Sequence, residues 1–279
     1  MSKRKRLLFT LSLFAVMMVL SACGTEPITS ESTGFWDRYV VLNFSNMIVW
    51  LSNLFFSNYG LGIIAFTIII RVILLPLNHF QTKSTKKMSA VQPKVKALQE
   101  KYASKDRETQ ERLQKEVSKL YADNDVNPYM GCLPVLVQMP VLMALYQAIS
   151  RTEILKSGSF LWMNLGERDP FFILQVVAAI LTYATSKLTM MSQAEANSAT
   201  KSMTYTMPIM ILMMGINFPS ALSLYWVASN AFSVGQTMLL NNPYKAIRER
   251  EEAEAQAKAR EKALKKAQNP KKKKKNYIG

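Results

Sequence analysis

Apolar residues along this chain gather in five long blocks, and charged residues gather between the blocks. A membrane-spanning helix needs about 20 consecutive, mainly apolar residues, which is near the length of these blocks. The pattern therefore predicts an all-α polytopic membrane protein with five transmembrane helices. The predicted spans cover residues 58–80, 129–150, 170–191, 203–218 and 220–240.

The segment between the first two spans, residues 81–125, is strongly polar but keeps apolar residues at helical spacing. This spacing places them on one face of a helix, so the segment predicts a cytoplasmic hairpin of two charged helices. Ser104 is expected to cap the second helix, because the apolar pattern is interrupted there. The apolar positions are Met88, Val91, Val95 and Leu98 in the first helix and Leu113, Val117, Leu120 and Tyr121 in the second.

The N-terminus, residues 1–22, has the features of an export signal: basic Lys3–Arg6, an apolar stretch, and small residues before Cys23. The last of these features resembles the bacterial lipobox. The resemblance implies cleavage before Cys23 and a diacylglycerol attached to it; an uncleaved signal anchor is the alternative. Residues 23–57 would then be an extracellular, lipid-anchored segment, and its aromatic-rich part, 35–56, predicts an amphipathic helix at the outer interface.

The formal net charge is +16, and the hairpin together with the tail, residues 241–279, holds 24 of the 35 Lys and Arg residues. Basic segments stay in the cytoplasm, so both are predicted to lie there. Residues 151–169 are then an extracellular loop and residues 192–202 a short cytoplasmic loop. Five spans that start outside end inside, which agrees with an outward-facing lipid-anchored N-terminus. The predicted location is the cell membrane.

Arg71 lies within the apolar run Leu61–Leu77. An arginine at mid-helix in a membrane costs roughly 2.5–3.5 kcal/mol on insertion scales. Two interpretations account for it. The guanidinium either reaches a nearby surface along its own side chain, or it faces a wet cavity inside a helix bundle. The second interpretation predicts a function built around a buried positive charge.

Polar side chains repeat at helical spacing on the other predicted spans as well. Four of the five spans carry such residues, which predicts helices facing a common polar interior. The alternative is that Ser, Thr and Asn join packed membrane helices by hydrogen bonds. The positions are Thr67, Arg71 and Asn78 in the first span, Gln138 in the second, Thr182, Thr185, Ser186 and Thr189 in the third, and Ser223, Trp226, Asn230, Ser233 and Thr237 in the fifth.

Several function classes lack the residues they need. No Asp or Glu falls inside a predicted span, which disfavours a proton- or cation-coupled transporter. The chain has one His and two Cys, too few for a zinc site or a disulfide framework. No pair of nucleophile and base is visible in the spans, so we expect neither an enzyme nor a metal or other cofactor. The basic tail has two open interpretations: adhesion to anionic lipid, or binding of an RNA-rich partner.

A series of short motifs runs through residues 35–240, in order and at fitting intervals, and it resembles the YidC/Oxa/Alb family of membrane protein insertases. The likeness is strongest to the lipoprotein-type members of Gram-positive bacteria, which include the spore-formation homologue of bacilli. The motifs are Phe35-Trp36-Asp37, Asn58-Tyr59-Gly60-Leu61, Thr67-Ile68-Ile69-Ile70-Arg71, Leu75-Pro76-Leu77, Gln92-Pro93, Lys101-Tyr102, Asn127-Pro128, Gly131-Cys132-Leu133-Pro134, Gln138-Met139-Pro140, Phe160-Leu161-Trp162, Leu165-Gly166, Asp169-Pro170, Met207-Pro208-Ile209-Met210, Asn217-Phe218-Pro219 and Leu222-Ser223-Leu224-Tyr225-Trp226.

The resemblance implies five spans around a hydrophilic groove that opens to the cytoplasm and to lipid. It places the family's essential groove arginine on Arg71, and Gln138 and Trp226 on positions that line or border the groove. Close relatives often carry glutamine near Thr185 and Ser186, whose shorter side chains leave substrate contact there open. The expected substrate-contacting set is Arg71, Thr67, Gln138, Thr185, Ser186, Trp226 and Asn230.

The implied function is insertion and folding of nascent membrane proteins, and possibly lipoproteins, alone or beside the Sec translocon. The expected partners are nascent membrane proteins, the ribosome through the basic tail, the Sec translocon and membrane lipids; no sequence-specific nucleic acid is expected. A channel or transporter with a polar intramembrane cavity is the main alternative. A purely structural lipoprotein that scaffolds other complexes is the second.

Overall fold

The structure is a computed structural model that describes residues 26–131, 133–193 and 198–268. The predicted signal peptide 1–22, the lipid-attachment residue Cys23 and the last residues of the tail lie outside this part of the chain. The elements are η1 (Asp37–Val41), α2 (Leu42–Leu54), α3 (Tyr59–Ile73), α4 (Leu75–Lys101), α5 (Arg107–Asp123), η2 (Pro128–Gly131), α6 (Leu133–Arg151), α7 (Glu153–Lys156), β1 (Ser159–Phe160), β2 (Met163–Asn164), α8 (Ile173–Met191), α9 (Ser198–Gly215), α10 (Ser220–Leu240) and α11 (Pro243–Gln268).

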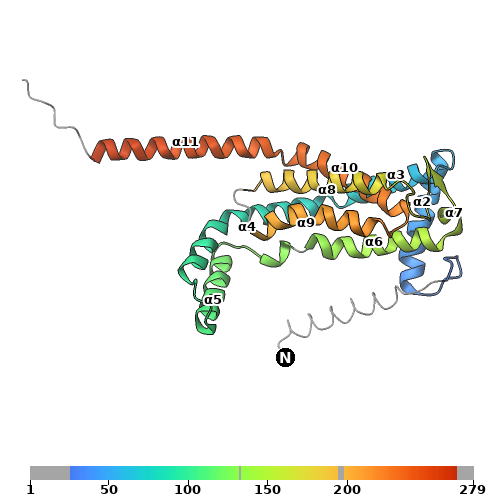
Figure 1. Ribbon diagram of the computed structural model, residues 1–279, viewed down its shortest axis with the longest axis horizontal. Coiled ribbons are helices and arrows are strands. Elements are labelled where there is room, and N and C mark those ends of the chain that lie inside the picture. The colour runs from blue at the N-terminus through green and yellow to red at the C-terminus, as the bar shows by residue number, and fades with distance from the viewer. Residues whose placement is uncertain (1–25, 132, 194–197, 269–279) are drawn as a thin grey trace, which may run out of the picture.

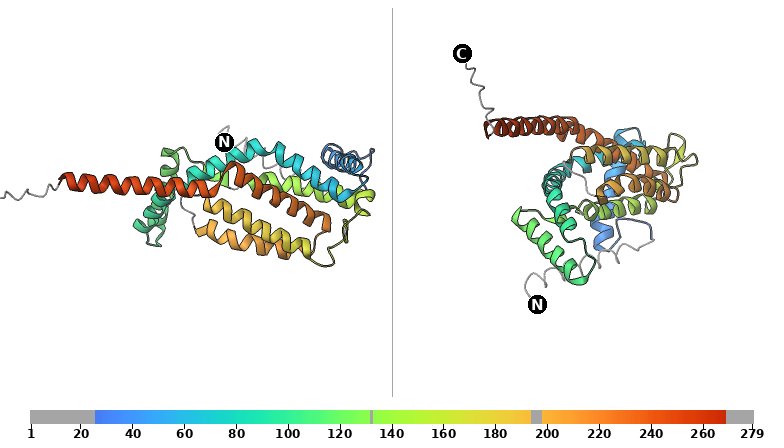
Figure 2. Two further views of the ribbon diagram at one scale, coloured as in Figure 1. Left: turned by 90° about the horizontal axis from the view of Figure 1, so that it is seen from above. Right: turned by 60° about the vertical axis from the view of Figure 1, so that its left-hand side comes forward.

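Five helices, α3, α6, α8, α9 and α10, run side by side along the long axis of the molecule (Figure 1). At one end, here called the clasp end, α2 crosses the bundle and lies near α7 and the small hairpin β1–β2. At the other end, the hairpin end, α4 continues into α5, and α11 projects away from the bundle (Figure 2). The predicted all-α class is confirmed, with the two short strands β1 and β2 as an addition that the hydrophobic pattern does not predict.

The buried core of the bundle is concentrated toward the clasp end. In α3 the buried residues run from Gly60 to Thr67, and in α8 from Leu174 to Thr182. In α10 the buried residues run from Ser220 to Ser229. Each of these helices therefore packs tightly over the half nearer the clasp end. The core side chains there include Ile48, Ile63, Phe66, Leu145, Ile149, Leu165, Leu174, Ala178, Leu222, Leu224 and Trp226.

A set of polar contacts, which we call the outer clasp, fixes η1 and α2 to the end of α6. Arg151 pairs with Asp37 through two hydrogen bonds, Nη1 to Oδ1 at 2.9 Å and Nη2 to Oδ2 at 2.6 Å. Trp36 donates from its indole nitrogen to Gln147 Oε1 at 2.8 Å. A bidentate pair of this kind is stronger and more directional than a single hydrogen bond. The clasp therefore determines how the N-terminal helix lies across the bundle.

Within the described part of the chain, one helix, α8, is by itself long and apolar enough to cross a membrane. The stretch from η1 through α3 meets that criterion only as a pair of helices bent by 117°. The apolar part of α6, Val135–Arg151, is shorter. Several Ser, Thr and Asn side chains in α9 and α10 lower the mean hydropathy of those two helices.

The two helices at the hairpin end, α4 and α5, pack through the apolar positions that the sequence pattern selects: Met88, Val91, Val95, Val117, Leu120 and Tyr121 form one cluster with Val126. The expected cap was wrong by two residues. Asp106 caps α5, because its carboxylate accepts from Thr109 N at 2.8 Å. Ser104 instead donates to the Asp106 carboxylate. The Ser104 hydroxyl, followed by the Thr109 amide, lowers the pKa of Asp106 from 3.8 to about 2.

Candidate functional site

Arg71 lies one helical turn beyond Thr67, the last buried residue of α3. Its guanidinium reaches α10, where Nε donates to Ser229 Oγ at 2.8 Å and Nη2 donates to the same oxygen. Ser229 is in turn the last buried residue of α10. The arginine is itself half-buried. The positive charge therefore lies at the level where the close packing of the bundle ends.

Two further polar side chains lie beside this pair. Tyr225 lies one turn before Ser229, so both side chains are on the same face of α10. Gln138 of α6 donates from Nε2 to the Tyr225 hydroxyl at 2.5 Å. The cluster of Arg71, Ser229, Tyr225 and Gln138, here called the arginine cluster, therefore draws on three helices: α3, α6 and α10.

The charge in this cluster has no ionic counterpart among the residues that the structure describes. None of the ion pairs among the described residues involves Arg71. A guanidinium has five N–H donors, and the hydroxyl of Ser229 is a neutral acceptor. A carboxylate accepts two parallel hydrogen bonds from arginine and neutralises its charge, so it would bind the same fork more strongly than a hydroxyl does. The site is suited to an anionic group that arrives from outside the chain.

The other predicted site residues are divided between two places. Thr67 is fully buried, and its hydroxyl donates to Ile63 O at 2.7 Å. Trp226 is also buried in the core, where its ring packs edge-on against Phe218. These two side chains therefore belong to the packed core next to the arginine cluster.

The second place is a contact between α8 and α10. Thr185 Oγ1 bonds its own helix at Leu181 O, at 2.9 Å, and lies 3.4 Å from Asn230 O. Asn230 turns its amide back to Trp226 O at 2.9 Å. Ser186 is half-buried on the neighbouring position of α8. Thr185 and Asn230 thus bond helix backbone, as expected of polar residues that join membrane helices.

Sequence reasoning missed Ser229, which contacts Arg71, and Tyr225, which contacts Gln138. The polar stripe expected on α10 runs through Trp226 and Asn230, one position further along the helix. A shift of one residue rotates the stripe by about 100°. A usable signal was present: Tyr225, Ser229 and Ser233 recur at i, i+4 and i+8, which places them on one face.

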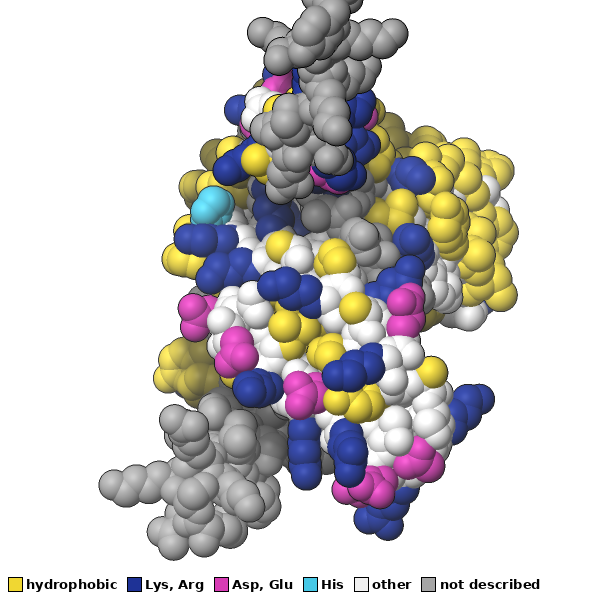
Figure 3. All heavy atoms as spheres, turned by 90° about the vertical axis from the view of Figure 1, so that its left-hand side faces the viewer, with side chains coloured by type: hydrophobic (Ala, Val, Ile, Leu, Met, Phe, Trp, Pro, Cys, Tyr) yellow, Lys and Arg dark blue, Asp and Glu magenta, His cyan; other side chains and the backbone are white. Residues whose placement is uncertain are grey.

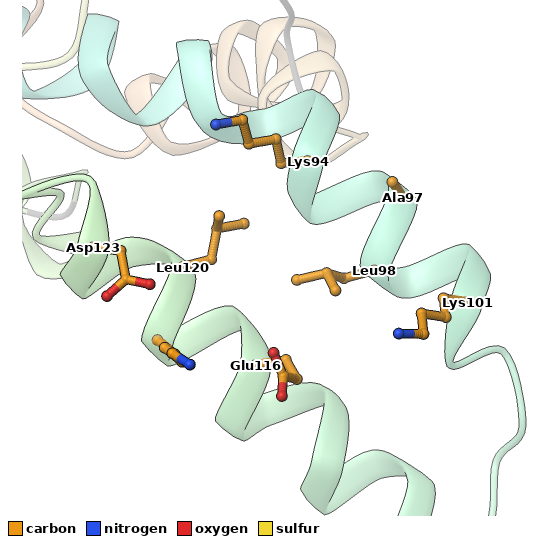
Figure 4. A pocket seen from close by; sticks show the side chains of 8 residues that line it. Lys94, Ala97, Leu98, Lys101, Glu116, Leu120 and Asp123 are labelled. Atoms are coloured by element: carbon orange, nitrogen blue, oxygen red, sulfur yellow. The ribbon is translucent and has the colours of Figure 1, made fainter.

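A hollow lies at the hairpin end, between α4 and α5 (Figure 4). Its volume is about 440 Å³. Leu98 and Leu120 form an apolar floor, and charged side chains of both signs surround it. The space-filling view of this end shows Lys and Arg side chains spread among acidic and hydrophobic ones (Figure 3). The lining residues are Lys94, Ala97, Leu98, Lys101, Glu116, Lys119, Leu120 and Asp123.

The tail helix α11 is fixed to the bundle at its base. Arg250 donates from Nη2 to Met191 O at 2.7 Å and from Nη1 to Gln193 O, so it binds carbonyl groups at the C-terminal end of α8. A cation there also complements the negative end of the helix dipole. On α4, Lys86 Nζ donates to Asn241 Oδ1 at 3.1 Å, just before α11 begins. The direction of α11 is therefore determined by contacts with both α8 and α4.

Comparison with known proteins shows which family has this sequence and architecture. The family model described as "60Kd inner membrane protein" matches residues 50–249. The membrane protein insertase YidC of Enterococcus faecalis is 57% identical over 273 residues, which cover 98% of each chain. The chain belongs to the YidC family of membrane protein insertases. The family predicted from the sequence motifs is thereby confirmed.

More distant members of the YidC family agree. The membrane protein insertase MisCA of Bacillus subtilis is 46% identical over 242 residues, covering 86% of this chain and 93% of that protein. A crystal structure titled as an active YidC insertase superposes with a TM-score of 0.58 at 31% identity. That match covers 74% of this chain and 47% of the solved one, so the chain spans about half of that longer protein. Insertase names among the relatives do not favour the channel or transporter alternative.

Proposed function

We propose that this protein is a membrane protein insertase of the cell membrane, which moves a short hydrophilic segment of a nascent membrane protein across the bilayer. The observation that carries the proposal is the position of Arg71. Its guanidinium has no ionic partner among the described residues. It lies where the buried core of the bundle ends, in a helix that we propose to span the membrane. Below that level the helices are less closely packed, and this supports a hydrophilic groove that is closed at the clasp end and open at the hairpin end.

In this proposal α3, α6, α8, α9 and α10 are the five spans, and the hairpin end faces the cytoplasm. Both basic segments, the hairpin α4–α5 and the tail helix α11, lie at that end of the bundle. The described N-terminal residues lie at the opposite end, where Ile28 N donates to Arg151 O at 3.0 Å. This arrangement supports the positive-inside orientation. It also supports an outward-facing position for the described residues that follow Cys23, the proposed lipid-attachment residue.

The mechanism uses charge first and apolar burial second. Two unit charges 4 Å apart attract by about 4 kcal/mol at an effective dielectric constant of 20, and desolvation offsets part of this. An acidic segment of a nascent chain is therefore drawn from the cytoplasmic side toward Arg71. Its apolar segment then passes along lipid-exposed side chains into the bilayer, and burial of apolar surface drives release.

The helix best suited to contact that apolar segment is α9. Among the strong packing contacts of the bundle, α9 has α8 as its neighbour, and its other side is exposed. Methionine is flexible and polarizable, which suits a surface that binds many different apolar sequences. The exposed apolar residues of α9 are Met203, Tyr205, Ile209, Met210, Met213 and Met214.

The cytoplasmic elements would receive the substrate. The tail helix α11 has 26 residues and is about 39 Å long, and the part beyond its base at Arg250 extends about 27 Å. Its basic surface would bind ribosomal RNA through phosphate contacts. The hairpin α4–α5 would meet targeting factors, the substrate or the Sec translocon. Deletion of residues 245–279 should weaken ribosome binding, more strongly at low salt; unchanged binding would leave only adhesion to lipid as the role of the tail.

The proposal is tested by replacing Arg71 in reconstituted vesicles. Arg71→Lys keeps the charge and should retain insertion of substrates with acidic N-terminal tails. Arg71→Ala removes the charge and should lose it. A substrate whose tail carries no acidic residue serves as the matched control and should differ much less between the two variants. Equal insertion of the acidic substrate by Arg71→Ala and wild type would refute the role of the charge.

A further inference from the structure

Bulky apolar residues adopt a left-handed backbone at three turns of this protein. Phe56, Leu161 and Phe172 have φ of 55°, 53° and 56°. Large side chains rarely occupy this region, and Gly or Asn is the usual choice. In the described part of the chain the other non-glycine residues with positive φ are the small polar residues Ser57 and Asp125. Such outliers persist where the surrounding structure enforces them, and they concentrate at functional surfaces.

The three turns all lie at the clasp end. Phe56 is in the bend between α2 and α3, Leu161 is in the β1–β2 turn, and Phe172 immediately precedes α8. The start of α3, which follows the first turn, packs against the β1–β2 hairpin that carries the second turn, because a Cβ added at Gly60 would lie 2.1 Å from Cγ of Phe160 in β1. Only glycine allows this approach. The two turns are therefore carried by elements that pack directly against each other.

A single buried carboxylate joins the second turn to the third. Asp169 is fully buried, and it accepts from Trp162 Nε1 at 2.9 Å. It also accepts from Phe171 N at 3.1 Å and Leu174 N at 2.9 Å, on either side of Phe172. These bonds fix the backbone on both sides of Phe172 and hold Trp162 next to Leu161. The left-handed turns at Leu161 and Phe172 are thus held by specific interactions beneath them.

The side chains at these turns point away from the protein. Phe56 is 100% exposed, Leu161 71% and Phe172 45%. Large apolar side chains around them are exposed too, and several are aromatic residues of the kind that prefers the membrane–water interface. These neighbours are Trp50, Leu54, Phe55, Trp162 and Phe171. Water is an unfavourable environment for so much apolar surface at one end of the molecule.

We propose that Phe56, Leu161 and Phe172 form a membrane anchor that occupies the boundary between headgroups and acyl chains in the outer leaflet and sets the depth of Arg71. The inference rests on the proposed passage of α3 through the membrane. From Tyr59 to Arg71 the helix rises about 18 Å. The hydrocarbon core is about 30 Å thick, so its midplane lies about 15 Å from either boundary. An anchor at the outer boundary thus places Arg71 near mid-depth.

Spin-label depth measurements test the anchor directly. Phe56→Cys, Leu161→Cys and Phe172→Cys are labelled one at a time in the full chain, in a shared Cys23→Ala, Cys132→Ala background that also removes any lipid on Cys23. In phosphatidylglycerol–phosphatidylethanolamine vesicles, all three labels should be accessible to oxygen and protected from an aqueous nickel chelate. Arg107→Cys, whose native side chain is 94% exposed at the hairpin end, is the aqueous reference.

Labels as accessible to nickel as the one at position 107 would overturn the anchor. Labels protected from both reagents would also overturn it, since they would indicate a protein partner in place of lipid.

The depth-setting role has its own test. The variant Phe56→Asn, Leu161→Asn, Phe172→Asn keeps the left-handed turns, because Asn tolerates that backbone. Its thermal unfolding midpoint in detergent should therefore be retained, while a label on Val72→Cys, next to Arg71, should move from its wild-type depth. The apolar control variant Phe56→Leu, Leu161→Phe, Phe172→Leu should keep the label at position 72 at its wild-type depth. An unmoved label at position 72 would refute the role. No substrate is present, so the result is independent of the insertase proposal.

Discussion

A carboxylate placed permanently beside Arg71 should inhibit the protein by imitating its proposed substrate. Ser229→Asp is the variant of choice, because Ser229 Oγ already accepts from Arg71 Nε at 2.8 Å and from Nη2. The aspartate side chain is one atom longer and carries two acceptor oxygens, so it can accept from both nitrogens in a bidentate pair. An acidic nascent chain would then have to compete with a tethered, always present anion.

The size of the effect follows from the geometry. The attraction is about 4 kcal/mol for charges 4 Å apart at an effective dielectric constant of 20. Desolvation of the new carboxylate reduces this to about 2–3 kcal/mol. Because 1.36 kcal/mol corresponds to a factor of ten, insertion of an acidic-tailed substrate should fall roughly 30- to 150-fold.

The assay is protease protection of the translocated tail in vesicles containing purified protein. Ser229→Asn is the matched control, since it is close in size and shape to Asp but uncharged, and it should remain within a few-fold of wild type. A substrate with a neutral tail should separate the two variants much less. If Ser229→Asp and Ser229→Asn insert the acidic-tailed substrate equally well, the electrostatic reasoning is wrong.

Two other predictions concern parts of the fold that support the site. In the outer clasp, Asp37→Ala leaves the guanidinium of Arg151, 7% exposed, without its partner and should destabilise the protein by about 2–3 kcal/mol in detergent, whereas Asp37→Ala with Arg151→Met should be close to wild type; additive losses in this double-mutant cycle would contradict the pairing. At the hairpin end, the lowered pKa of Asp106 means that its cap stabilises α5 above about pH 4 and is lost as the pH falls toward 2. The helical circular dichroism signal of wild type should therefore decrease over that range relative to Asp106→Asn, and identical pH profiles would show that the cap is unimportant.

Much of the helix order follows from the hydrophobic pattern, because burial in lipid or in a core requires apolar side chains at helical spacing. The positions picked out on the hairpin helices, such as Val91, Val95 and Val117, are those that pack together in the structure. The β1–β2 turn could not be predicted in this way. Its strands have two residues each, which is too short to show an alternation of apolar and polar positions. It is held by hydrogen bonds such as that from Trp162 to Asp169, which a hydrophobic pattern does not reveal.

The arginine cluster was only half predictable. Arg71 stands out because a charge within an apolar block is costly, and Gln138 stands out as a polar residue within the second block, in agreement with the family motif. Which residues of α10 meet them depends on the rotation of that helix about its axis. Rotation is determined by packing against α3 and α8, and a pattern of Ser, Thr and Asn on several faces does not specify it. Ser229 was therefore missed, while Asn230, one position away, bonds its own helix.

The central claim is that acidic segments of nascent chains come to Arg71. It is tested most directly by a photoreactive residue at Gln138, which belongs to the arginine cluster through its bond to Tyr225 and whose replacement leaves Arg71 in place. Stalled nascent chains with an acidic tail should crosslink to position 138 in the presence of Arg71, and the yield should fall sharply in Arg71→Ala. Equal yields with and without the arginine, or equal yields from acidic and neutral tails, would contradict the account.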